Sequence, residues 1–254
     1  MPSFRLLAPA LFALALCGAP PASAQKFSDT QRGDIEVIVR EYLLKHPEVL
    51  EEAMAELSRR QTAAEAQKHE ASVATNKEAI FNSPRGVTVG ARDGDVTMVE
   101  FFDYNCGYCK RAMTDMMELM KSDPKLKVVL KEFPVLGPGS VEAAQVAVAV
   151  RMQDPSGKKY LDFHQKLLNG KGQADKARSM AAAKEAGADM AKLEKDLASP
   201  EVRATLEENF KLAEAMGMNG TPSYVIGKQV VIGAVGVEGL REKISVARCG
   251  KATC

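Results

Sequence analysis

The chain has 254 residues and a formal net charge of +1, and 46% of its residues are hydrophobic. These values are typical of a globular protein. The near-neutral charge argues against a nucleic-acid or anionic-membrane surface, both of which need a basic patch. With no Trp and only five Tyr, a platform for stacking nucleic-acid bases is not expected either. Composition therefore excludes partners without identifying one.

The first 24 residues have the pattern of a secretory signal peptide. Arg5 supplies a positive charge, the apolar run Leu6–Leu16 is too short to cross a bilayer, and Ala22-Ser23-Ala24 offers small residues for cleavage. Cys17 raises the alternative of a lipoprotein, but the Leu before it is larger than a lipobox normally accepts. We therefore treat residues 1–24 as a signal peptide and expect a protein exported to the periplasm.

Residues 25–82 are predicted to form an N-terminal helical extension. Asp34 is expected to cap one helix, and Pro47 suits the first turn of the next. From Ser58 to Asn76 the chain is mostly Ala, Gln, Glu, Lys and Arg, which predicts a solvated helix with too little apolar surface to pack on a domain. The apolar residues before this stretch recur three and four apart, at Ile35, Ile38, Val39, Tyr42, Leu50, Ala53, Met54 and Leu57.

Two interpretations of this extension remain open. It is either a solvated linker, helical because of its Ala content, or an oligomerisation segment that packs against other copies of the chain. A long helix with a one-sided apolar stripe has to bury that stripe, which favours a homo-oligomer. The break at Pro47 and the lack of clean heptads argue against a regular coiled coil.

Residues 83–254 are predicted to form one α/β domain. A buried strand at Val96–Phe102, a helix and a second strand at Leu126–Phe133 predict a parallel βαβ unit. Residues 140–217 are almost wholly helical, with Gly or Pro at the breaks between helices. The predicted order is therefore β-α-β, a helical insertion at about 140–217, and then β-β-α. The last three elements are strands at 223–226 and 230–232 and a helix at 238–247.

The cysteine pair Cys106-Gly107-Tyr108-Cys109 lies where the first strand meets the following helix. The start of a helix presents unpaired N–H groups and the positive end of its dipole, which lower the pKa of a thiol there. Cys106 is therefore predicted to attack a substrate disulfide, and Cys109 to resolve the mixed disulfide. A pair two residues apart closes too small a loop to stabilise much chain, which also favours redox chemistry.

The remaining cysteines, Cys249 and Cys254, are predicted to form a structural disulfide. Four intervening residues allow the geometry, and exported chains favour disulfides. The alternative is a zinc site in which they join Cys106 and Cys109, but structural zinc sites prefer tight local spacing. We therefore expect no metal and no cofactor.

Copper binding is an alternative function of another class. The helix after the cysteine pair carries Met113, Met116, Met117 and Met120. Thioethers and thiols are soft ligands of the kind that Cu(I) prefers. Their spacing is also that of a core-facing helix, and Met commonly fills cores, so core packing is favoured.

The second motif, Gly220-Thr221-Pro222-Ser223, lies just before the third core strand. Because Pro has no N–H to give to a sheet, a Pro at this point favours a cis peptide bond between Thr221 and Pro222. This would expose the Thr221 backbone for pairing with a substrate strand. The alternative is a trans Pro in an ordinary turn, which the preceding Asn219-Gly220 also suits.

Taken together, these motifs resemble the DsbA-like proteins of the thioredoxin superfamily. The shared features are a Cys-x-x-Cys pair after the first buried strand, helices inserted between the second and third strands, and a Thr-Pro pair before the third. The segment Glu100–Cys106 is close to the active-site strand of that group. Ile38–Leu44 and Pro47–Leu50 are similar to the N-terminal region of the suppressor-of-copper-sensitivity C proteins.

The resemblance implies a thioredoxin fold with Cys106 as nucleophile, Cys109 as resolving thiol and Pro222 as a cis proline beside Thr221. Glu100 matches a buried acid that assists proton transfer to the inner cysteine; its alternative is a strand-edge carboxylate in water. The implied partners are proteins with thiols or disulfides and a membrane redox partner that recycles the active site.

The direction of the reaction is predicted from the same resemblance. Strong oxidases of the group carry Pro-His between the cysteines and Val before the proline, whereas Gly107-Tyr108 and Thr221 resemble the disulfide isomerases, which are oligomers kept reduced. An isomerase needs a ready thiolate, and several sites held together help it to retain a misfolded substrate. We therefore expect an isomerase or reductase, with a DsbA-like dithiol oxidase as the alternative.

Overall fold

The computed structural model describes residues 27–254, so the predicted signal peptide and Cys17 lie outside the described residues. The chain divides into two compact units, one that ends at Ser58 and one that runs from Arg59 to Cys254. Among residues 27–254, every helix is too short or too polar to span a membrane.

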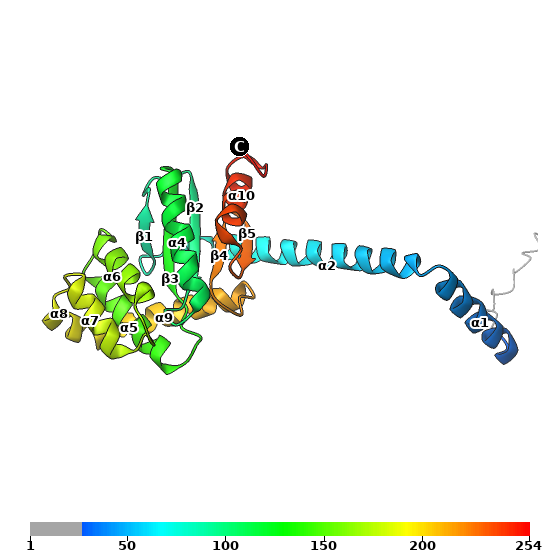
Figure 1. Cartoon of the computed structure of the whole chain (residues 1–254), viewed down its shortest axis with the longest axis horizontal. Helices are drawn as coiled ribbons and strands as arrows, with labels where there is room; N and C mark the ends of the chain where they lie inside the picture. The colour runs from blue at the N-terminus through cyan, green and yellow to red at the C-terminus, as the bar shows by residue number, and fades with distance from the viewer. Residues whose placement is uncertain (1–26) are drawn as a thin grey trace, which may run out of the picture. The chain divides into compact units, whose positions relative to one another are not determined.

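The second unit is built on a five-stranded mixed sheet in the order β1-β3-β2-β4-β5 (Figure 1). The parallel pair β2 and β3 is joined by α4, as the sequence predicts, and β4 and β5 form an antiparallel hairpin. The edge strand β1 was not predicted, because only four residues between turn-rich segments form it. The bounds are β1 (Val87–Gly90), β2 (Val96–Phe102), α4 (Gly107–Ser122), β3 (Leu126–Glu132), β4 (Ser223–Ile226) and β5 (Gln229–Ile232).

A group of helices follows β3, where the sequence predicts a helical insertion. Helix α5 is its centre and packs against the four helices that follow it. Gly157 and Pro200 lie at the starts of two of these helices, where their backbone preferences suit the breaks. The helices are α5 (Pro138–Met152), α6 (Lys158–Asn169), α7 (Lys176–Glu185), α8 (Met190–Leu197) and α9 (Pro200–Ala215), and α10 (Gly236–Cys249) follows the hairpin.

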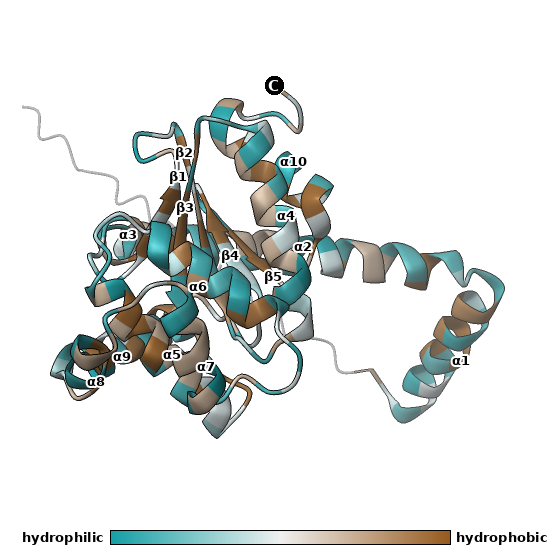
Figure 2. Cartoon of the chain, turned by 60° about the vertical axis from the view of Figure 1, so that its left-hand side comes forward, coloured by the Kyte–Doolittle hydropathy of each residue, from teal (hydrophilic) through white to brown (hydrophobic). Residues whose placement is uncertain are grey.

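Different helices cover the two faces of the sheet, because side chains alternate along each strand (Figure 2). On β2, Met98 and Phe102 pack in the cluster that includes α4, α6 and α10, whereas Val99 and Phe101 pack against α9 and the segment before β1. Glu100 shares the face of Met98 and Phe102. The register of one strand therefore directs a carboxylate toward the helix that carries the cysteines.

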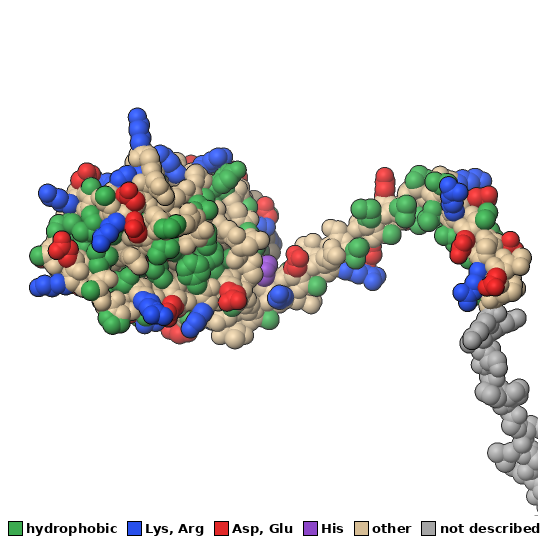
Figure 3. Space-filling view, turned by 90° about the horizontal axis from the view of Figure 1, so that it is seen from below, with side chains coloured by type: hydrophobic (Ala, Val, Ile, Leu, Met, Phe, Trp, Pro, Cys, Tyr) green, Lys and Arg blue, Asp and Glu red, His purple; other side chains and the backbone are tan. Residues whose placement is uncertain are grey.

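The first unit contains α1 (Asp29–Lys45) and the start of α2 (Glu48–Thr75). A capping box begins α1: the Ser28 hydroxyl accepts from the Gln31 N–H, and the Gln31 side chain accepts from the Ser28 N–H. Asp34, the predicted cap, lies inside the helix because this upstream pair supplies the cap. No residue of α1 is buried, and apolar side chains gather on α1 and the start of α2 (Figure 3).

The end of α2 corrects the prediction of a solvated helix over residues 58–76. Val73 is 3% exposed and packs in the same apolar cluster as Ile80 of α3 (Lys77–Phe81). The Ser72 hydroxyl donates to the Ala215 carbonyl oxygen, and Lys228 pairs with Glu70. One apolar side chain with two polar contacts is enough to hold a helix whose average composition is polar. The compact domain therefore includes residues upstream of 83.

Candidate active site

Cys106 is the N-cap residue of α4 and follows the loop that leaves β2. It is 8% exposed, Cys109 is 1% exposed, and both are free thiols. Cys106 Sγ lies 3.2 Å from the carbonyl oxygen of Thr221, to which it donates a hydrogen bond when it is protonated, and the Thr221–Pro222 peptide bond is cis. The fold therefore brings the two sequence motifs into contact across 115 residues of chain.

The pKa of Cys106 is lowered to about 5. The largest cause is a hydrogen bond from the Cys109 thiol. The side chain of Thr221 and the backbone N–H groups of Cys109 and Tyr108 lower the pKa as well, while burial opposes them. The helix dipole also favours a negative charge at this position. Cys106 is thus a thiolate at neutral pH, which is the form that attacks a disulfide.

Cys109 has the opposite character. Its pKa is raised far above the usual value, first because its proton is hydrogen-bonded to Cys106, then because burial and the Glu100 charge disfavour a thiolate. The two sulfurs therefore share one proton, which stays on Cys109. The inner thiol is held unreactive until Cys106 has become bonded to something else.

Glu100 lies in β2, which pairs with β3 on one side and β4 on the other. It is 2% exposed, so the alternative of a strand-edge carboxylate in water is wrong. Burial, followed by the negative charges of Asp115 and Cys106, raises the pKa of Glu100 to about 8. Among the described residues, its Oε2 has no hydrogen-bond partner. Such a carboxyl group is mostly protonated at neutral pH, and the fraction able to accept a proton from Cys109 grows as the pH rises through about 8.

Asp103 anchors the active-site loop and was missed by the sequence analysis. Its carboxylate is 1% exposed. It accepts hydrogen bonds from the backbone N–H groups of Asn105, Val135 and Leu136 and from the Ser140 hydroxyl, at 2.7 to 2.9 Å. The loop before Cys106 is therefore tied to the start of the helical insertion.

Asn105 and Tyr104 add two further ties to the insertion. Asn105 accepts from the Ala174 N–H at 2.7 Å and donates to the Ala174 carbonyl oxygen at 2.9 Å. The Tyr104 hydroxyl lies 3.4 Å from that of Tyr160 and 3.3 Å from Nδ1 of His164, both on α6. All three residues before Cys106 thus have partners in the insertion. No local motif could reveal those partners.

Exposed apolar side chains lie next to the cysteines. Tyr108 is 60% exposed, and the Arg111 guanidinium lies 5.5 Å from the centre of its ring. Val135 and Leu136, whose N–H groups bind Asp103, are 38% and 51% exposed. Tyr108 thus offers an apolar contact between the two cysteines, and Val135 and Leu136 offer apolar contacts beside the loop that precedes Cys106.

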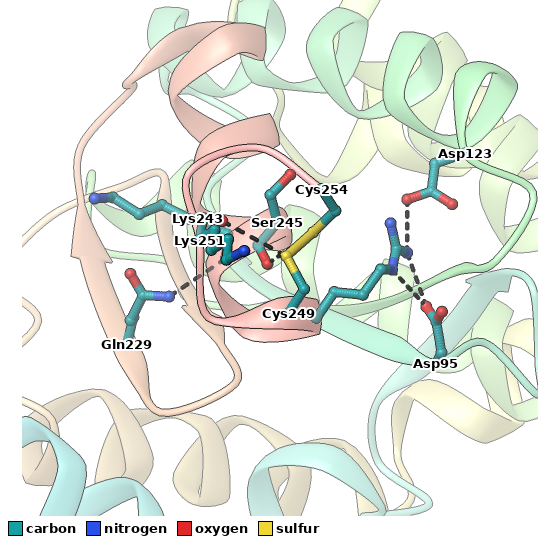
Figure 4. The surroundings of a disulfide bond; sticks show 9 residues. Asp95, Asp123, Gln229, Lys243, Ser245, Cys249, Lys251 and Cys254 are labelled. Atoms are coloured by element: carbon teal, nitrogen blue, oxygen red, sulfur yellow. Dashed lines mark hydrogen bonds and ion pairs between the residues drawn. A yellow bond between two sulfur atoms is a disulfide. The ribbon is translucent and has the colours of Figure 1, made fainter.

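The other residues of the alternative zinc and copper sites form a disulfide or pack in and against the apolar core. Cys249 and Cys254 form a disulfide (Figure 4), and the neighbouring Arg248 pairs with Asp123, at the end of α4 remote from Cys106. The four cysteines therefore do not gather into the alternative zinc site. The four methionines of α4 pack within or against the apolar core, which accounts for their helical spacing. Within residues 27–254, no three or more His, Cys, Asp or Glu side chains gather in a way that could hold a metal ion.

Comparison with known families assigns two parts of the chain. Residues 97–245 match the DSBA-like thioredoxin domain, and residues 31–64 match the copper resistance protein ScsC N-terminal domain. A thioredoxin-like oxidoreductase from Silicibacter pomeroyi is 40% identical with a TM-score of 0.64, covering 68% of this chain and 98% of that one. ScsC of Proteus mirabilis is 30% identical with a TM-score of 0.64, covering 88% of this chain and 98% of that one.

Curated relatives give weaker matches. The thiol:disulfide interchange protein DsbA of Bordetella pertussis is 27% identical over 141 residues, which are 53% of this chain and 64% of that protein. The Na⁺/H⁺ antiporter NhaA 1 of Salinispora arenicola is 24% identical over 163 residues, and the chain spans only 24% of its length.

Proposed function

The chain belongs to the DSBA-like thioredoxin family, which confirms the predicted fold and resemblance, and on this premise we propose that it is a periplasmic thiol–disulfide oxidoreductase working through Cys106 and Cys109. The observation that carries the proposal is a low-pKa thiol at the start of α4, in contact with the carbonyl oxygen of Thr221. Family membership supports the reaction class, and the geometry supports the residues.

The reaction begins when the Cys106 thiolate attacks one sulfur of a substrate disulfide. The substrate S–S bond breaks, the departing sulfur leaves as a thiolate and takes a proton, and a mixed disulfide joins Cys106 to the substrate. The Cys109 proton then no longer has a thiolate partner, and Glu100 accepts it. Cys109 attacks the Cys106 sulfur and releases the substrate as a dithiol. Two electrons have passed to the substrate, and a membrane partner reduces Cys106–Cys109 again.

Isomerisation uses only the first half of this sequence. A free thiol of the substrate attacks the mixed disulfide, forms a new substrate disulfide and returns Cys106 as a thiolate. Cys109 then serves to free the enzyme from substrates that do not rearrange.

The substrate is proposed to be an extended segment of an unfolded or misfolded protein. When Cys106 ionises it stops donating to Thr221, and the Thr221 carbonyl oxygen becomes available to a substrate N–H. Tyr108, Val135 and Leu136 supply apolar contacts beside it. An extended chain can use backbone and apolar contacts together, which suits recognition that does not depend on one sequence.

We favour an isomerase or reductase acting as a homo-oligomer. Gly107-Tyr108, Thr221 and the exposed apolar side chains of α1 support this choice. One observation favours the oxidase alternative: a thiolate stabilised to a pKa of about 5 stabilises the reduced form, which makes the disulfide form a stronger oxidant.

Ribonuclease refolding separates these possibilities. We expect the wild type to restore activity to scrambled ribonuclease faster than it oxidises reduced ribonuclease, and Cys106→Ala to do neither. If oxidation is faster than isomerisation, the protein is an oxidase rather than an isomerase. Full activity in Cys106→Ala would overturn the proposed site.

A further inference from the structure

The disulfide between Cys249 and Cys254 takes no part in the proposed reaction, and it joins no two elements of the fold. Cys249 is the last residue of α10, and Cys254 lies five residues further along the chain. Both cysteines and all the residues between them are exposed. The entropic stabilisation from a disulfide grows with the length of the loop it closes. Because this bridge closes a loop of only five residues' separation, its stabilisation is small. The disulfide therefore contributes little to the stability of the fold.

The end of α10 is also held without the bridge. Leu240 and Ile244 bury one face of the helix. Arg248 donates to Asp95 and to Asp123, each at 2.8 Å. Gly250 adopts the left-handed conformation and donates its N–H to the Val246 carbonyl oxygen, which caps the helix. Opening the disulfide would leave these contacts of α10 in place.

We propose that Cys249–Cys254 is a second thiol–disulfide exchange site, open to low-molecular-weight thiols and to exposed thiols of other proteins. Both residues of the bridge are exposed, whereas Cys106 is only 8% exposed. Lys251, two residues from Cys249, lies beside the bridge (Figure 4). Lys243 is paired with Glu242, and Asp95 and Asp123 nearby are paired with Arg248. The positive charge of Lys251 therefore favours the approach of an attacking thiolate.

The exchange proceeds by two displacements. A thiolate attacks the sulfur of Cys249, the bridge breaks, and Cys254 leaves as a thiolate that takes a proton. A second thiol of the reductant then displaces Cys249, so the reductant becomes a disulfide and the bridge becomes two thiols. Cys254 is the leaving group because a thiolate on Cys249 would face the negative end of the α10 dipole.

The site is independent of Cys106. Helix α4 has 16 residues, with Cys106 before its first residue and Asp123 after its last. At 1.5 Å per residue this separates its ends by about 24 Å. Since Arg248 is bonded to Asp123, the disulfide lies beyond the reach of Cys106 in the same copy. The reductant has to be another molecule, whether or not the proposed function is right.

The test uses the full chain with Cys106→Ser and Cys109→Ser, so that loss of the proposed active site cannot affect the result. Reduced glutathione is added to the folded protein and to the same protein in urea, and the C-terminal peptide is followed by alkylation and mass spectrometry. We expect the two opening rates to agree within about threefold, as for an exposed disulfide. A folded rate lower by about a hundredfold would overturn the proposal, because exchange would then require unfolding.

Two further variants sharpen the outcome. Cys249→Ser with Cys254→Ser should leave the urea midpoint of the domain unchanged, and a lower midpoint would make the bridge structural. Lys251→Glu should slow opening by anionic glutathione more than opening by cationic cysteamine. Equal slowing by the two reagents would contradict the role of the local charge.

Discussion

The single proton shared by Cys106 and Cys109 determines the reactivity of the site, and it leads to a prediction about pH. Alkylation by iodoacetamide follows the thiolate fraction, so the rate at Cys106 should rise with pH through a midpoint of about 5 and level off below neutrality. Cys109→Ala removes the largest stabilising hydrogen bond, and the midpoint should move upward. Thr221→Ala should move it in the same direction by less. A wild-type midpoint near 9, the usual value for a thiol, would contradict the account.

Glu100 leads to a second prediction at this scale. Its pKa is about 8, so the fraction able to accept a proton grows as the pH rises through 8. The decay of a preformed mixed disulfide at Cys106 should therefore accelerate across this window in the wild type and lose that dependence in Glu100→Gln. If Glu100 acted only by its charge, Glu100→Gln would make Cys109 more acidic and speed the decay. Stopped-flow release of a labelled peptide distinguishes the two results.

The site residues differ in how far the sequence could predict them. Cys106 and Cys109 could be found because the chemistry depends on their spacing and on the start of a helix. Thr221 was predicted from the position of the Pro that follows it, and Glu100 through resemblance to a family. Asp103 and Asn105 were missed because their partners in the insertion are 32 to 69 residues away along the chain. A side chain that acts through distant backbone groups leaves no local pattern.

At the scale of elements, the helical insertion holds the loop that carries Cys106, and Asp103 is its principal contact. Asp103→Ala leaves four donors without their acceptor. We expect the free energy of unfolding to fall by about 2–4 kcal/mol. Urea denaturation measures this change, with Asp93→Ala, an exposed aspartate, as the control. A loss in the control equal to that in Asp103→Ala would remove the anchoring role.

Strong periodicity made most elements predictable, and two short features escaped. Strand β1 has four residues and exists because β3 offers an unpaired edge. The end of α2 packs through Val73, although its composition is that of a solvated helix. Both depend on partners that fold elsewhere in the chain, which a local pattern does not contain.

At the scale of the whole molecule, the exposed stripe of α1 predicts self-association. Val39 and Val37 are 49% and 56% exposed, and two residues of helix place them about 200° apart. Val39 lies on the stripe with Ile35, Ile38 and Tyr42, whereas Val37 lies opposite. We expect Val39→Glu to reduce the mass in sedimentation velocity toward that of one chain, and Val37→Glu to leave the wild-type oligomer intact. Equal masses for all three proteins would leave the stripe without this role.

In the proposed reaction, Cys106 exchanges disulfides and Cys109 resolves the product. The most direct measurement is the trapping of a mixed disulfide, with insulin as the disulfide-bonded substrate and peptide mapping by mass spectrometry. Cys109→Ser should accumulate an adduct at Cys106 that dithiothreitol removes, and Cys106→Ser should accumulate none at the active site. No adduct with Cys109→Ser, or an equal active-site adduct with Cys106→Ser, would contradict the account.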